Sequence, residues 1–151
     1  MRPYGPAALR LCVGAVFLAH GAQKLFGVWD GPGLAGTAAF LAAHGLTPAY
    51  PLAILVASGQ FGGGALLIVG ALARWAALAL ALDVGFSAWK LHYLNGVIVS
   101  SARGEGLEFS LVLIGALLCL MLTGPGALSV DEWRTSSAEA KAAGRARARK
   151  V

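Results

Sequence analysis

The sequence predicts an all-α integral membrane protein: an antiparallel four-helix bundle with a short surface helix in its first outer loop. Of the 151 residues, 58% are hydrophobic and only 13% are charged, which is about half the charged fraction of an average soluble domain. The apolar residues form runs of about twenty, the length that an α-helix needs to cross the ~30 Å hydrocarbon core. The 21 glycines favour close packing between membrane helices.

The first span is expected at about residues 7–26, and it ends in the polar stretch His20-Gly-Ala-Gln-Lys24. Arg10 lies one turn inside its start, so we expect this side chain to snorkel to the inner membrane surface. Residues 37–44 have the pattern of a short helix, which Gly45 stops. This segment is too short to span, and we expect it to lie on the outer membrane surface.

Three further spans are expected at about residues 50–72, 75–94 and 107–122. The turn between the first two of them is very short, which makes those helices antiparallel neighbours. The three glycines at residues 62–64 are interpreted as a close helix contact and not as a phosphate-binding loop. Residues 1–133 therefore form one membrane domain, and residues 134–151 are expected to form a basic, disordered tail.

The distribution of Lys and Arg predicts the orientation. Nine of the 12 basic residues fall on the side that holds both termini, which places both termini in the cytoplasm of a multi-pass protein. The tail is interpreted as facing anionic lipid headgroups. Nucleic acid is the alternative partner for such a tail, and we do not expect it here.

Two polar residues are predicted near the bilayer centre. Gln60 and Asp83 lie in the middle of neighbouring spans and are expected to face each other. An ionised carboxylate costs several kcal/mol at this depth, so Asp83 should be protonated or paired with a base. Its role is either that of a proton relay or quinone-binding acid, or that of a neutral hydrogen bond worth ~0.6 kcal/mol that joins two helices.

The other candidates gather near the outer ends of the spans: His20, Lys24, Lys90, His92 and Glu108. His20 and Lys24 are four residues apart and share one helix face, and Lys90 shares a face with Asp83. Pointing inward, these groups would form a polar pocket that suits an anion, a quinone head group or proton movement. Pointing outward, they are snorkelling lysines and interfacial charges.

Metal and disulfide chemistry are disfavoured by the spacing. His20, His92 and Glu108 are suitable ligand types, but they do not have the spacing of a metal motif, so no metal is expected. Cys12 and Cys119 lie far apart inside apolar runs. They are interpreted as small packing residues, with a redox pair as the alternative.

Several motifs occur in a fixed order: Leu9-Arg10, Phe17-Leu-Ala-His20-Gly21, Lys24-Leu-Phe-Gly27, Gly62-Gly63, a run ending at Arg74, Glu105 with Glu108, and Gly124-Pro-Gly126 followed by Ser129 and Asp131. In this order and spacing the chain resembles the DoxX family of small bacterial membrane proteins over about residues 9–133. The family often has an acid just before the Gly-Gly pair. This chain has Gln60 at that place.

The resemblance implies a four-helix bundle in the bacterial cytoplasmic membrane. It also implies a role in redox reactions at the membrane. One branch of the family is a quinone-coupled thiosulfate oxidoreductase, and another forms an oxidoreductase complex with thiol and superoxide defence enzymes. We therefore expect a component of a quinone- or thiol/sulfur-linked membrane redox system. Whether it is itself a catalytic oxidoreductase subunit stays open.

The chain has no haem, flavin or Fe–S motif, so no covalently bound cofactor is expected, and quinone is the expected ligand. Expected partners are the lipid bilayer, soluble redox enzymes at the cytoplasmic face and further copies of the chain. One alternative is a non-catalytic membrane scaffold or chaperone-like subunit that docks soluble partners. A small-solute transporter is a second alternative, disfavoured because we find no inverted repeat.

Overall fold

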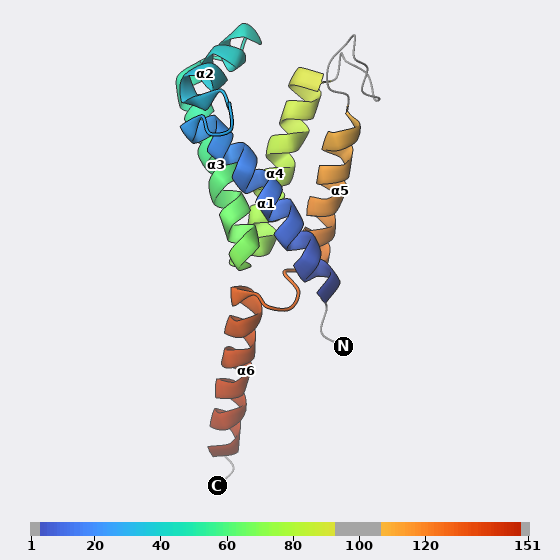
Figure 1. Cartoon of the computed structure of the whole chain (residues 1–151). Coiled ribbons are helices and arrows are strands. Elements are labelled where there is room, and N and C mark those ends of the chain that lie inside the picture. The colour runs from blue at the N-terminus through green and yellow to red at the C-terminus, as the bar shows by residue number, and fades with distance from the viewer. Residues whose placement is uncertain (1–3, 93–106, 149–151) are drawn as a thin grey trace.

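The computed structural model describes residues 4–92 and 107–148, and these residues form helices and connecting turns without a strand (Figure 1). The helices are α1 (Tyr4–Phe26), α2 (Gly33–Ala43), α3 (Ala49–Val69), α4 (Ala73–Ser87), α5 (Glu108–Thr123) and α6 (Val130–Ala148), and α4 continues into a π-helical segment, η1 (Ala88–His92). The expected spans correspond to α1, α3, α4 with η1, and α5. The expected surface helix corresponds to α2. By length and composition, α1 and α3 are able to cross a membrane.

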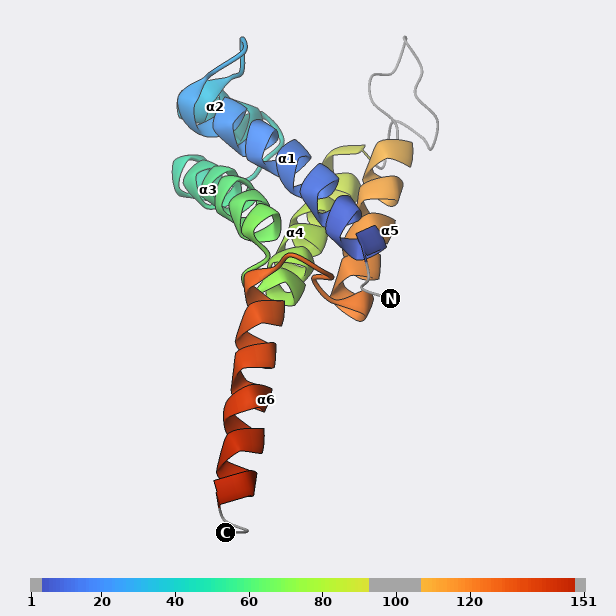
Figure 2. The same cartoon turned by 60° about the horizontal axis from the view of Figure 1, so that its bottom comes forward.

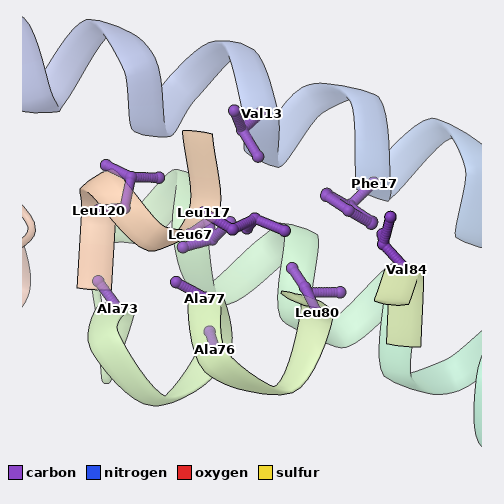
Figure 3. Close-up of a cluster of buried hydrophobic side chains, with 10 residues drawn as sticks. All are labelled: Val13, Phe17, Leu67, Ala73, Ala76, Ala77, Leu80, Val84, Leu117 and Leu120. Atoms are coloured by element: carbon purple, nitrogen blue, oxygen red, sulfur yellow. The ribbon is translucent and has the colours of Figure 1, made fainter. Parts of the chain in front are cut away.

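Four helices, α1, α3, α4 and α5, pack around a shared set of buried side chains, and we call them the helical core (Figure 3). Val13 and Phe17 of α1 meet Leu80 and Val84 of α4 in this cluster. Leu67 of α3 and the α5 residues Leu117 and Leu120 are almost completely buried. The apolar face of each helix thus packs against its neighbours.

Glycines allow α1 and α3 to approach each other closely. A Cβ atom at Gly64 would lie only 2.5 Å from the backbone nitrogen of Leu18 and 2.8 Å from the carbonyl oxygen of Gly14. Gly21 meets the backbone of Phe61 in the same way. The interpretation of residues 62–64 as a close helix contact is therefore confirmed for Gly64, and Gly63 lies against the side chain of Leu80, whereas Gly62 has no heavy atom within 4 Å.

The helix α2 covers one end of α3. Ala38 and Leu41 are buried against Ala53, whereas Phe40 is exposed. The apolar residues of α2 thus divide between contact with α3 and the surface.

The prediction that Arg10 snorkels to the membrane surface is wrong. This side chain is only 1% exposed, and its guanidinium donates to the carbonyl oxygens of Leu67 (2.8 Å), Ile68 (2.8 Å) and Leu128 (3.0 Å). The last turn of a helix leaves carbonyls unpaired and carries partial negative charge, so the C-terminus of α3 attracts the cation. We call this end of the helical core the Arg10 end.

Gly70 makes room for the guanidinium. It follows α3 in the left-handed conformation, with φ of 73°, which glycine adopts without strain. A Cβ atom at this position would collide with Arg10 Nη1 and with the side chain of Ser129. A glycine is therefore required here both by the backbone and by the close approach.

The linker between α5 and α6 is fixed at the Arg10 end by two caps. The carboxylate of Asp131 accepts hydrogen bonds from the backbone N–H groups of Leu72 and Ala73, both at 3.0 Å, and so caps α4. The hydroxyl of Ser129 accepts from the N–H of Glu132 at 3.1 Å and caps α6. Both side chains satisfy donors that a helix N-terminus leaves unpaired.

Residues 134–148 of the tail that we expected to be disordered form most of α6 in the structure. This helix extends away from the helical core at the Arg10 end (Figure 2). Its sequence is rich in Ala, Arg, Glu and Lys, which have high helix propensity. Asp131 and Glu132 in its first turn favour the N-terminus further.

Candidate functional site

A chain of hydrogen bonds connects three helices inside the helical core. The ammonium of Lys24 on α1 donates to Gln60 Oε1 on α3 at 2.7 Å, and Gln60 Nε2 donates to Asp83 Oδ2 on α4 at 2.6 Å. Gln60 is 6% exposed, and the other two side chains are half-buried. The prediction that Gln60 and Asp83 face each other is therefore confirmed.

The direction of these bonds follows from the chemistry of the groups. An ammonium can only donate hydrogen bonds, so it requires the amide oxygen. The amide nitrogen is then left to donate to the carboxyl oxygen of Asp83. Lys24 and Asp83 also interact electrostatically, so the base that the sequence required for Asp83 comes from α1 and acts through Gln60.

A cavity of about 400 Å³ lies beside this chain, between α1, α3, α4 and α5. It occupies the half of the helical core away from the Arg10 end, and we call it the Lys24 cavity. Its polar lining is His20, Gln23, Lys24, Gln60, Ser87 and Ser110, and its apolar lining is Phe17, Val84, Phe109 and Leu113. Such a mixture of apolar walls and few polar groups is typical of small-molecule sites.

His20 stands at the rim of the Lys24 cavity. The residue is exposed overall, but it belongs to the lining. Its ring meets that of Phe109 edge to face, with centroids 6.5 Å apart. Helix α1 thus contributes an imidazole and an ammonium, four residues apart, to the same wall.

The other predicted site residues are not part of the lining. Lys90 is exposed and lies on η1. The expectation that it shares a helix face with Asp83 assumed 3.6 residues per turn, and the π-helical winding of η1 breaks that period. Glu108 is half-buried at the start of α5, next to Phe109 of the lining. The side chain of His92 lies outside the described residues.

Sequence reasoning missed most of the lining, including Gln23, Phe109 and Ser110. Gln23 is three residues after His20, so the same-face rule that paired His20 with Lys24 would have found it. Phe109 and Ser110 follow Glu108 directly. Their positions depend on the rotation of α5 about its axis, for which the sequence carries a weak signal because apolar residues surround this helix.

Metal and thiol chemistry have no geometry to support them in the described part of the chain. No three His, Cys, Asp or Glu side chains there could hold a metal ion together. Cys12 and Cys119 are both exposed, free thiols.

Comparisons with known proteins give the family. A model of the DoxX family matches residues 5–93, a range that contains Lys24, Gln60 and Asp83 but not the motifs around Glu108 and Asp131. Inner membrane protein YqjF of Escherichia coli (strain K12) is 30% identical over 129 residues, which cover 84% of this chain and 89% of that protein. No solved structure matches the chain. Because the family match covers more than half of its length, the chain belongs to the DoxX family of membrane proteins.

Proposed function

We propose that α1, α3, α4 with η1, and α5 each cross the bacterial inner membrane, with both termini in the cytoplasm. The 23 residues of α1 extend about 35 Å and the 21 residues of α3 about 32 Å at 1.5 Å per residue, enough to cross ~30 Å of hydrocarbon. The 16 residues of α5 extend only about 24 Å, a shortfall that local thinning of the bilayer accommodates. Large apolar side chains such as Leu55, Leu82 and Val112 are 66–69% exposed on three of these helices. An apolar exterior of this kind suits lipid and not water.

We propose further that the Lys24 cavity binds the head group of a quinone in a membrane redox system. The observation that carries this proposal is the chain from Lys24 through Gln60 to Asp83. Lys24 and Gln60 line a partly apolar cavity, and Asp83 lies behind them, outside the lining. A quinone carbonyl accepts hydrogen bonds, and Lys24 and His20 offer donors at one wall. Phe17 and Phe109 offer aromatic surface for the ring.

The same residues suit proton handling. Reduction of a quinone to a quinol takes up two electrons and two protons, so a site needs donors beside the carbonyl oxygens. Lys24 and His20 can supply protons at the cavity, and Asp83 stabilises the cationic form of Lys24 through the Gln60 amide. The electrons come from a soluble redox partner or from a reduced sulfur compound.

The test is the binding of a short-chain benzoquinone to the purified protein in lipid nanodiscs, measured by calorimetry. We expect Lys24→Ala to weaken binding about tenfold, which corresponds to the loss of one charge-assisted hydrogen bond. Lys90→Ala is the matched control, because it removes an exposed lysine outside the lining, and its affinity should stay at the wild-type value. Equal affinity of the Lys24 and Lys90 variants would remove the basis of the proposal.

A second proposed function is a scaffold that docks soluble redox enzymes, and α6 favours it. This helix stands apart from the helical core and exposes Lys141 and Arg145 (Figure 1). The test is affinity purification of the protein with and without residues 136–151. The truncated chain should no longer copurify with a soluble redox enzyme, and its affinity for quinone should be unchanged. Full recovery of the partner by the truncated chain would count against docking through α6.

A further inference from the structure

A second cavity, of about 570 Å³, lies at the Arg10 end between the start of α4, the linker after α5 and the first turns of α6. It shares no lining residue with the Lys24 cavity. We call it the Arg74 cavity. Its lining contains two arginines, Arg74 and Arg134, together with Trp75 and Thr135.

The charges of the Arg74 cavity leave its arginines available to a ligand. Two carboxylates, Asp131 and Glu132, also line it. Asp131 is already engaged, because both of its oxygens accept backbone hydrogen bonds from the start of α4 and it interacts electrostatically with Arg10. Across residues 4–92 and 107–148, no hydrogen bond or ion pair joins Arg74 or Arg134 to a carboxylate. The lining therefore has two guanidinium groups and only one carboxylate, that of Glu132, whose oxygens are not already used by hydrogen bonds to the backbone of the described residues.

The surroundings of the cavity match the headgroup level of a membrane. Trp75 in its wall is 71% exposed, and Trp133 on α6 is 70% exposed. Exposed tryptophans gather at membrane–water interfaces, where one side of the ring is wet and the other apolar. Leu72 and Pro125 add apolar surface beside the arginines.

We propose that the Arg74 cavity binds the phosphodiester group of an anionic phospholipid. Guanidinium groups hold phosphate oxygens through paired hydrogen bonds, and here they approach from two elements, α4 and α6. Basic pockets at the ends of membrane helices bind anionic headgroups for the same reason. The bound lipid bridges the helical core and α6, and this site is independent of the quinone proposal.

The experiment uses the full chain with phosphatidylglycerol as the probe, and counts the retained lipids by native mass spectrometry after purification in detergent. We expect the wild type to retain phosphatidylglycerol in preference to phosphatidylcholine. The double variant Arg74→Gln/Arg134→Gln should bind it at least about tenfold more weakly. The matched control is Lys141→Gln/Arg145→Gln, which removes the same charge from the exposed far part of α6 and should retain the lipid as the wild type does.

Four outcomes would overturn the proposal. Unchanged retention in the Arg74/Arg134 variant excludes the site, and equal loss in both double variants means that only net charge matters. If glycerol phosphate in solution displaces the lipid and binds as tightly, the site recognises a free phosphate and not a lipid. If the glutamine variant does not fold, Arg74→Lys/Arg134→Lys replaces it, since this variant keeps the charge but loses the paired hydrogen bonds. Its lipid affinity should fall by about threefold or more. An unchanged lipid affinity would also refute the assignment.

Discussion

Replacement of Arg10 by methionine tests the account of the Arg10 end. The guanidinium donates three hydrogen bonds to carbonyls of α3 and of the linker after α5. Leu67 also accepts from the N–H of Gly70 at 3.2 Å, so it keeps a partner. Ile68 and Leu128 have no other hydrogen bond to their carbonyls among the described residues, and both would be left unpaired.

The magnitude follows from these two carbonyls. An unpaired buried polar group costs about 1–3 kcal/mol. The sum of roughly 2–6 kcal/mol for the pair is an upper bound, because both hydrogen bonds are only partly buried. Methionine also removes a buried charge, and this relieves part of the cost. We expect a net loss of about 3 kcal/mol in the free energy of unfolding, or a Tm lower by roughly 6–12 °C for a chain of this size.

The assay is thermal unfolding of the purified protein in detergent, followed by circular dichroism. Arg145→Met is the matched control, because this arginine is exposed on α6, and its Tm should equal that of the wild type. Arg10→Lys should fall between the two, since one ammonium cannot reach three carbonyls in the fork geometry of a guanidinium. A Tm of Arg10→Met within about 2 °C of the wild type would refute the reasoning.

Three further predictions concern other parts of the fold. Gly64→Ala should lower the free energy of unfolding by about 1–3 kcal/mol, because its Cβ meets backbone atoms of α1. Gly62→Ala is the control: its Cβ has no heavy atom within 4 Å, so denaturant titration should show an unchanged free energy of unfolding or a gain of up to ~1 kcal/mol. Equal losses in the two variants would contradict the close contact at Gly64. Gln60→Glu would put two carboxyl groups at the 2.6 Å contact with Asp83, which requires a proton between them. Its Tm relative to the wild type should therefore fall as pH rises from about 5 to about 8, and parallel pH profiles would speak against this contact. Asp131→Ala should lower the free energy of unfolding by about 1 kcal/mol and speed hydrogen exchange at the amides of Leu72 and Ala73. Unchanged exchange at these two amides would show that Asp131 does not cap α4.

The positions of the apolar helices could be predicted because each apolar run is a local property of the sequence. The expected ranges differ from α1, α3 and α5 by three residues or fewer at each end. The environment of Arg10 could not be predicted in the same way, because its partners Leu67 and Leu128 lie 57 and 118 residues further along the chain. The position of Arg10 along α1 does not show that the C-terminus of α3 lies beside it.

The candidate site was predictable where the helices are regular. Gln60 and Asp83 lie 23 residues apart on helices joined by a short turn. Counting residues inward from the ends of the two expected spans placed both at the same depth. Lys24 reaches Gln60 from 36 residues away, which requires the close contact of α1 with α3. The same counting failed for Lys90, because it assumed regular winding through η1.

The position of Arg10 has a consequence for the order of events during synthesis. The ribosome makes Arg10 long before it makes Leu128, one of the three acceptors of its guanidinium. While the later helices are still missing, the guanidinium of Arg10 has none of its three carbonyl partners. It is fully paired only after α3, α5 and the linker that follows α5 have been made. Chains that stop before residue 128 therefore retain an incompletely paired guanidinium in α1.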